Sequence, residues 1–237
     1  FPFLVSVIVS MIVLWLFLRK DIPSHVNINL LKNPRAAIKH VGLFNFSWLF
    51  LTVLLSGYFI GDAYNIPVSV FALGGGILFL MIASYTKTVE PRHIIKNAPW
   101  QVVWFSLGLY IVVYGLKNAG LTDYITDILV YLNTQSDVVA VVGTGFLAAF
   151  LSAIMNNMPT IMVMDISLHE IPNQAMIYAN IVGCNLGPKM TPFGSLATLL
   201  WLHTLNKKGV KISFWSYSKF GLIVTPPILL AVLLSLV

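Results

Sequence analysis

Two long apolar segments of this chain are interrupted in their middles by residues that end or begin helices. They run from Leu151 to Met164 and from Ile181 to Leu199, with Asn, Pro and Thr in the first and Asn, Gly, Pro and Thr in the second. Within hydrocarbon, backbone outside the helical hydrogen-bond pattern is tolerated only where it is buried in protein or lines a wet cavity. The two interruptions are therefore expected to meet and to enclose one solute site.

The first segment is predicted to form a hairpin over residues 138–167. Its apolar run meets Asn156 and Asn157, and Pro159 then restarts the helix, since the fixed φ of proline suits a first helical turn. The returning arm is short, which favours a tip inside the membrane that returns to the side it entered from. The prediction is a re-entrant hairpin.

The second segment is predicted to be a discontinuous transmembrane helix over residues 174–203. Gly187 followed by Pro188 is a stop signal, whereas Thr191 before Pro192 is an N-cap before a favoured first residue. Such a break leaves carbonyls without partners on one half-helix and amides without partners on the other. Together these groups are able to hold a small polar solute.

Composition places the whole chain in the membrane. Of the 237 residues, 58% are hydrophobic and only 9% are charged, whereas charged residues make up about 25% of an ordinary soluble domain. Apolar runs of about twenty residues recur, and alternating strands of about ten residues are absent. The fold class predicted is an all-α polytopic membrane protein, a single transmembrane domain over 1–237 with further spans at about 1–18, 46–60, 68–84, 99–116 and 214–237.

The basic residues predict the orientation of these spans. Eleven of the 14 Lys and Arg residues lie on three loops, which follow residues 18, 84 and 203. By the positive-inside rule these loops are cytoplasmic. No basic helix or aromatic-interleaved patch accompanies the net charge of +6, so no nucleic-acid partner is expected.

The residues expected around the solute share amides, hydroxyls or freed backbone groups. Such groups both donate and accept hydrogen bonds, which suits a small polyhydroxyl solute. The predicted substrate-binding residues are Asn156, Asn157, Thr160, Gly183, Asn185, Gly187, Thr191, Gly194 and Ser195.

Two charged residues are the candidates for proton coupling. Lys189 is the only basic residue assigned to the middle of the membrane, where an amine has reason to exchange its proton or to replace a coupling cation with a fixed charge. Asp165 is the nearest carboxylate in sequence. The alternative for Lys189 is that it snorkels to water or pairs structurally. The single cysteine, Cys184, excludes a multi-thiolate metal site, and neither a metal nor a cofactor is expected.

Three stretches of the chain resemble one known family. Residues Pro99 to Ile125, Gly145 to Thr160 and Ala179 to His203 are similar to the bacterial arsenite/antimonite efflux permease of the ion transporter superfamily. The similarity extends over essentially all 237 residues and is most specific in GCNLGPKMTPFGSLATLLW. Because a full member has about twice this length, the chain resembles the C-terminal repeat, with the N-terminal repeat absent.

The resemblance implies a function that composition alone does not. The family exports arsenite and antimonite across the plasma membrane, driven by protons, and associates in some bacteria with a soluble arsenite-stimulated ATPase. Related structures contain two inverted repeats, each with a re-entrant hairpin and a broken helix, so this chain is implied to be one inverted-repeat half. Their hairpin tips carry Ser-Asn-Thr. The tip here matches only at Asn157 and Thr160, which speaks against sodium or carboxylate binding.

Other functions remain open at this point. Another carrier of the superfamily, a sodium/proton antiporter or a dicarboxylate carrier, is disfavoured because Asn185 and Lys189 stand where a cation exchanger would use an acid. An intramembrane enzyme is disfavoured because no nucleophile has a base nearby. A non-transporting truncated fragment is the third alternative.

Overall fold

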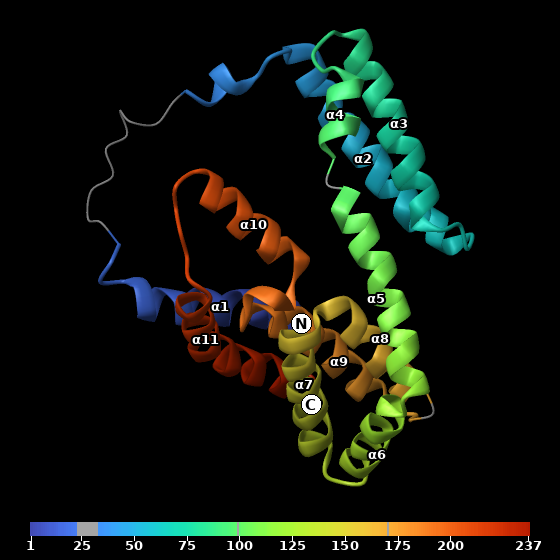
Figure 1. Ribbon diagram of the computed structural model, residues 1–237, viewed down its shortest axis with the longest axis vertical. Helices are drawn as coiled ribbons and strands as arrows, with labels where there is room; N and C mark the ends of the chain where they lie inside the picture. The colour runs from blue at the N-terminus through green and yellow to red at the C-terminus, as the bar shows by residue number, and fades with distance from the viewer. Residues whose placement is uncertain (23–32, 99, 170) are drawn as a thin grey trace. The chain divides into compact units, whose positions relative to one another are not determined.

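The computed structural model describes residues 1–22, 33–98, 100–169 and 171–237, and all secondary structure in these ranges is helical (Figure 1). Four helices within these ranges are long and apolar enough to cross a membrane: Val41–Ala63, Val68–Tyr85, Asp137–Met155 and Phe214–Leu234. The predicted all-helical membrane class is confirmed. The chain divides into a smaller unit, Pro23–Trp100, and a larger unit, Phe1–Ile22 with Gln101–Val237.

The smaller unit contains a pair of apolar helices, α2 (Val41–Ala63) and α3 (Val68–Tyr85), with η2 (Pro34–Ala37) before them and α4 (Pro91–Asn97) after. α2 begins earlier than the predicted residue 46 because Nδ1 of His40 accepts a hydrogen bond from the Leu43 amide at 3.0 Å and caps the helix. The helices pack closely where Gly61 faces the Phe71 ring, since a Cβ at Gly61 would overlap that ring. Residues 23–32, part of the first basic loop, lie outside the described residues.

The larger unit holds both interrupted segments. Its elements are α1 (Pro2–Leu18), α5 (Trp100–Asn118, from Gln101 onward), α6 (Leu121–Asn133), α7 (Asp137–Met155), α8 (Asn157–Leu168), α9 (Gln174–Leu186), η3 (Gly187–Lys189), η4 (Pro192–Gly194), α10 (Leu196–Lys207) and α11 (Phe214–Leu234). α7 is the central helix, and it packs against α6, α8, α9 and α11.

Small residues on α7 bring the neighbouring helices unusually close. Gly145, Ala148, Ala149 and Ser152 lie on its buried face. A Cβ at Gly183 of α9 would overlap the Gly145 carbonyl and would lie 2.8 Å from Cβ of Ala148. α7 and α9 therefore meet through their backbones rather than through long side chains.

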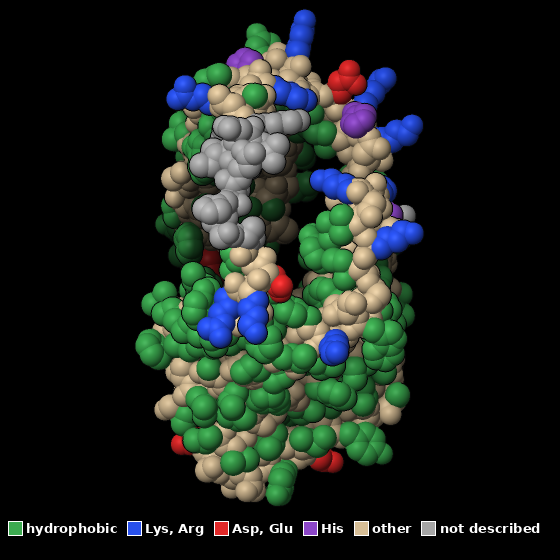
Figure 2. Space-filling view, turned by 90° about the vertical axis from the view of Figure 1, so that its left-hand side faces the viewer, with side chains coloured by type: hydrophobic (Ala, Val, Ile, Leu, Met, Phe, Trp, Pro, Cys, Tyr) green, Lys and Arg blue, Asp and Glu red, His purple; other side chains and the backbone are tan. Residues whose placement is uncertain are grey.

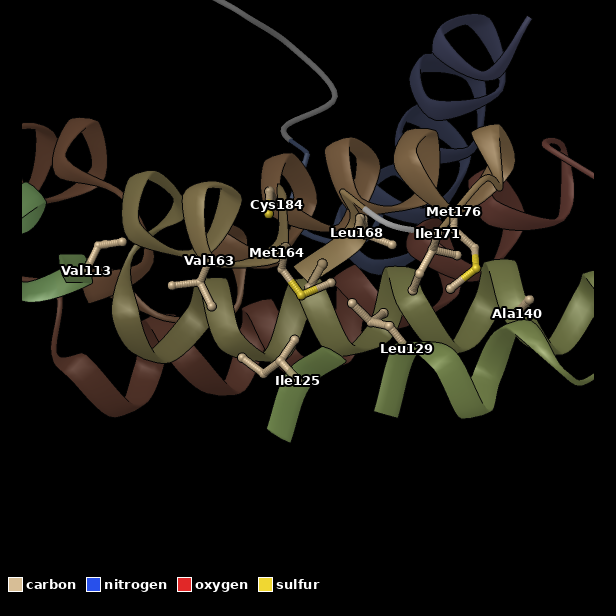
Figure 3. Close-up of a cluster of buried hydrophobic side chains, with 11 residues drawn as sticks. Val113, Ile125, Leu129, Ala140, Val163, Met164, Leu168, Ile171, Met176 and Cys184 are labelled. Carbon is tan, nitrogen blue, oxygen red and sulfur yellow. The ribbon is translucent and has the colours of Figure 1, made fainter. Parts of the chain in front are cut away.

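Two apolar clusters pack against α7. One joins α5, α6, α8 and α9 and includes the fully buried side chains of Leu129, Met164 and Met176 (Figure 3). The other joins α9 and α11, with Leu229 and Leu233 fully buried. Outside these clusters many large hydrophobic side chains are exposed, and they cover much of the face shown in Figure 2. Such a surface is typical of helices that face lipid.

Two predicted spans coincide with helices that are not among the four long candidates. α1 has 17 residues and a rise of about 26 Å, slightly less than the hydrocarbon thickness of about 30 Å. α5 covers Trp100–Asn118, and residue 99, the predicted start of this span, lies outside the described residues.

Candidate functional site

The first interruption is a turn of a single residue. α7 ends at Met155 and α8 begins at Asn157, so Asn156 alone joins them, with φ 84° and ψ 152°. This backbone conformation is rare for residues other than glycine. Asn156 also caps α8, because its Oδ1 accepts from the Met158 amide at 3.3 Å and its carbonyl accepts from Oγ1 of Thr160 at 2.8 Å.

The second interruption separates α9 from α10 by two short 3₁₀ turns. α9 ends at Leu186, η3 and η4 follow, and α10 begins at Leu196. Oγ1 of Thr191 accepts from the Gly194 amide at 3.2 Å, and Oγ of Ser195 accepts from the Ala197 amide at 3.2 Å. Thr191 thus caps the 3₁₀ turn that starts at Pro192, as predicted. Ser195, and not Thr191, caps the α-helix that resumes at Leu196.

The two interruptions meet through side chain-to-backbone hydrogen bonds. Nδ2 of Asn156 donates to the Phe193 carbonyl at 3.1 Å. In the opposite direction, Oγ1 of Thr191 donates to the carbonyl of Ala153, near the end of α7. Each interruption therefore satisfies a backbone carbonyl of the other.

Close backbone packing reinforces this junction. Oγ of Ser152, fully buried on α7, donates to the Cys184 carbonyl at 3.1 Å. A Cβ at Gly187 would overlap the carbonyl of Ala149, and one at Gly194 would lie 2.5 Å from Cα of Pro188. Larger residues at Gly187 or Gly194 would force these segments apart.

The nine predicted substrate-binding residues divide by exposure. The buried ones, which build the junction itself, are Asn156, Thr160, Gly183, Gly187 and Gly194. Thr191, Asn157 and Ser195 are half-buried, and Asn185 is exposed. Among the described residues, Nδ2 of Asn185 donates to one nearby acceptor, the Ile181 carbonyl at 2.8 Å. The side chains best able to reach a solute are those of Asn157, Asn185 and Ser195.

The two coupling candidates line different cavities of the larger unit. Lys189, at the end of η3, lines a cavity of about 460 Å³ with residues of α1, α10 and α11. Asp165, on α8, lines a cavity of about 590 Å³ together with Asp123, Asp127 and His169. Lys189 and Asp165 are thus not brought together. Within the described ranges, no three His, Cys, Asp or Glu side chains gather closely enough to hold a metal ion.

Two contributors to the junction were missed by the sequence analysis. Ser152 lies four residues before Asn156, and that spacing on one helical face is the signal that could have found it. Gly221 of α11 packs against η3, where a Cβ would overlap the Lys189 carbonyl. A glycine inside the last apolar span was the available signal. Cys184 is buried, and its Sγ donates to Oδ1 of Asn180 at 3.2 Å.

These features define a multi-pass helical membrane protein whose larger unit is built around two adjoining helix interruptions. Comparison with known proteins identifies the group. The chain belongs to the arsenical pump membrane protein family, whose model matches residues 1–237. The resemblance stated from the sequence is thereby confirmed.

Individual relatives agree with this assignment. The chain is 44% identical over 236 residues to the arsenical pump membrane protein of Escherichia coli K12, covering 98% of this chain and 55% of that protein. It is 46% identical over 228 residues to the Yersinia enterocolitica protein of the same name, covering 94% and 53%. A putative arsenical pump membrane protein of Bacillus subtilis is 31% identical over 167 residues, covering 68% and 37%. The chain thus spans about half the length of the Escherichia coli and Yersinia enterocolitica proteins, and no solved structure matches it.

Proposed function

We propose that this chain is one inverted-repeat half of a secondary transporter that exports arsenite and antimonite across the bacterial plasma membrane, coupled to the proton gradient. The observation that carries the proposal is the junction of the two helix interruptions through Asn156 and Thr191, in a chain that belongs to a family of arsenical pumps. A pump of this family moves its solute and is not an enzyme.

The lengths of the helices support a re-entrant hairpin and a discontinuous transmembrane helix. α8 has 12 residues and rises about 18 Å, too little to cross a hydrocarbon layer of about 30 Å. α9 and α10 have 13 and 12 residues and are each too short alone, whereas together they are long enough to span the layer. In this arrangement the junction lies near the middle of the bilayer.

The chemistry at the junction suits a neutral solute. Arsenite at neutral pH is an uncharged trihydroxide, which needs hydrogen-bond donors and acceptors rather than a counter-charge. Asn157, Asn185 and Ser195 supply amide and hydroxyl groups. The nearest carboxylate along α8, Asp165, is eight residues beyond Asn157, which corresponds to about 12 Å along the helix.

The relatives are about twice as long as this chain, so we infer that the remaining half completes the solute site. In the superfamily arrangement that half is the N-terminal repeat, with its own hairpin and broken helix. A soluble arsenite-stimulated ATPase is a further partner to test.

Arsenite uptake into everted membrane vesicles tests the proposal. The chain is expressed alone and fused to the part of the Escherichia coli relative that it does not match. Proton-driven arsenite uptake is expected in the fused form. Sodium- or succinate-driven flux without arsenite movement would instead establish another carrier of the superfamily, and no flux of any solute would establish a non-transporting fragment.

A matched pair of variants tests the predicted solute contacts. Asn185→Ala removes an exposed amide beside the junction, and losing about one hydrogen bond lowers uptake roughly three- to ten-fold. Asn206→Ala is the control. It removes an exposed amide at the end of α10 that is far from the junction, and it is expected to leave uptake unchanged. Equal uptake by both variants would remove Asn185 from the site.

A further inference from the structure

A cavity of about 460 Å³ lies among α1, η3, α10 and α11, within the larger unit. It lies on the α11 side of the broken helix, whereas the hairpin tip contacts the break through Phe193. The junction residues Asn156, Thr191 and Ser195 do not line it. The cavity is therefore separate from the solute contacts proposed above, and its role is a separate question.

The cavity is elongated along α11. Its lining residues on this helix run from Ser216, two residues after the helix begins, to Ile228, a rise of about 18 Å. The loop that precedes α11 carries Lys207, Lys208 and Lys211 and is cytoplasmic by the positive-inside rule. Since the hydrocarbon layer is about 30 Å thick, the cavity reaches from the cytoplasmic end of α11 past the middle of the bilayer.

The position of α1 also indicates that the cavity runs inward from the cytoplasmic side. It contributes Ser10 and Leu14 to the lining, and Leu14 is nearer the basic residues Arg19 and Lys20 that follow the helix. α1 and α11 pack against each other. In Figure 1 the end of α1 that leads to the cytoplasmic loop lies on the same side as the start of α11.

The broken helix lines part of the cavity. η3 packs against α11 where Gly221 contacts the Lys189 backbone, about 7 Å further along the helix than Ser216. Lys189 itself lines the cavity there. A solute that enters at Ser216 would meet the break before it reaches the inner end at Ile228.

The lining is mostly apolar, and its polar groups are hydroxyls and the Lys189 amine. Hydroxyl groups occur along its length, on Ser10, Ser216, Tyr217 and Thr225, between apolar side chains such as Val224. Each hydroxyl both donates and accepts, so a small trihydroxide could exchange one hydrogen bond for the next. Among the described residues, Lys189 is the only charged one in the lining, and its positive charge disfavours a metal cation along the path.

We propose that this cavity is the cytoplasmic access path through which water and the neutral solute reach the broken helix. The identity of the solute rests on the function proposed above, whereas the access of water from the cytoplasm does not. The competing occupant of such a cavity is a lipid acyl chain, and the following experiment distinguishes the two.

Single cysteines at matched depth test the path. In a Cys184→Ser background, which removes the chain's one native cysteine, Thr225→Cys and Ser10→Cys place thiols in the cavity on two different helices. Ile223→Cys is the control: it lies two residues from Thr225 on α11, is 47% exposed and is not part of the lining. The variants are made in the chain fused to the unmatched part of the Escherichia coli relative, in everted vesicles that present the cytoplasmic face.

The readout is the rate of reaction with a membrane-impermeant anionic methanethiosulfonate. Because the thiolate is the reactive form and ionises only where water reaches it, both cavity cysteines are expected to react roughly ten-fold or more faster than Ile223→Cys. Reaction of the cavity cysteines only with a lipid-soluble maleimide would overturn the proposal in favour of an acyl chain. If Thr225→Cys perturbs folding, Ser10→Cys on α1 gives the same test.

A second readout separates the path from the transported solute. After labelling, the vesicles with Thr225→Cys are expected to lose most arsenite uptake, whereas those with Ile223→Cys keep it. Rapid labelling with unchanged uptake would overturn the path as the route of the solute. Rapid labelling in a protein that moves no arsenite before labelling would refute the proposed function and leave the water path standing.

Discussion

Asn156 offers a quantitative test of the junction, because one side chain and one backbone angle can be perturbed separately. Asn156→Ala removes the hydrogen bond to the Phe193 carbonyl, about 1 kcal/mol, and the cap on α8, about another 1 kcal/mol. It also places alanine at φ 84°, which adds roughly 1 kcal/mol of strain. The expected loss is about 3 kcal/mol.

Asn156→Gly isolates the backbone contribution. Glycine accepts a positive φ without strain and is itself a fair N-cap, so the expected loss falls to about 1–1.5 kcal/mol, mostly the Phe193 hydrogen bond. Asn65, at φ 56° in the exposed turn between α2 and α3, is the matched control. Asn65→Ala should cost only the strain of about 1 kcal/mol.

The buried Cys184 provides the assay. It is the chain's one cysteine, so a thiol-reactive dye in detergent solution reports the temperature at which the junction opens. At roughly 2–4 °C per kcal/mol for a chain of this size, Asn156→Ala lowers the midpoint by about 6–12 °C and Asn156→Gly by about 2–6 °C. Equal midpoints for the two variants would refute the strain argument, and unchanged midpoints in both would refute the junction.

Three further predictions follow from the same contacts. Thr191→Val keeps the side-chain shape but removes its hydrogen bonds, so the midpoint falls by about 2–8 °C in the same dye assay, and an unchanged midpoint would contradict the bond to α7. Gly187→Ala forces backbones apart and lowers the midpoint further. Gly74→Ala leaves it unchanged, because a Cβ there would have no described atom within 4 Å, and the reverse order would refute the packing. Lys189→Ala and Asp165→Asn are expected to reduce uptake independently, because the two side chains line separate cavities. The double variant then shows the product of the two reductions in uptake. A double variant no worse than either single variant would place both residues in one relay.

The positions of the interruptions were predictable because their signals are local. Helix-ending and helix-starting residues act on their own segment, independently of the rest of the fold, and here they are Asn156 with Pro159 and Gly187 with Pro188. The partners across the junction were not predictable in this way. That Asn156 bonds to Phe193, 37 residues away, follows from the packing of α7 on α9.

The roles of the predicted site residues were harder to read than their positions. A glycine that frees backbone for a solute and a glycine that admits a neighbouring helix look alike in a sequence. Gly183, Gly187 and Gly194 are of the second kind, since each faces another backbone segment. Asp165 was named beside Lys189 because it is the nearest carboxylate in sequence, whereas in the structure the two residues line different cavities.

The backbone contact between α7 and α9 also limits how such a transporter is able to move. Where Gly183 of α9 meets Gly145 of α7 the contact is between backbones, so no long side chain there can change rotamer, and close-packed surfaces resist gradual sliding. Hairpin and broken helix must then travel as one rigid piece. Any alternation between inward and outward states has to be accommodated at other boundaries of the larger unit, such as the one where α1 meets α11.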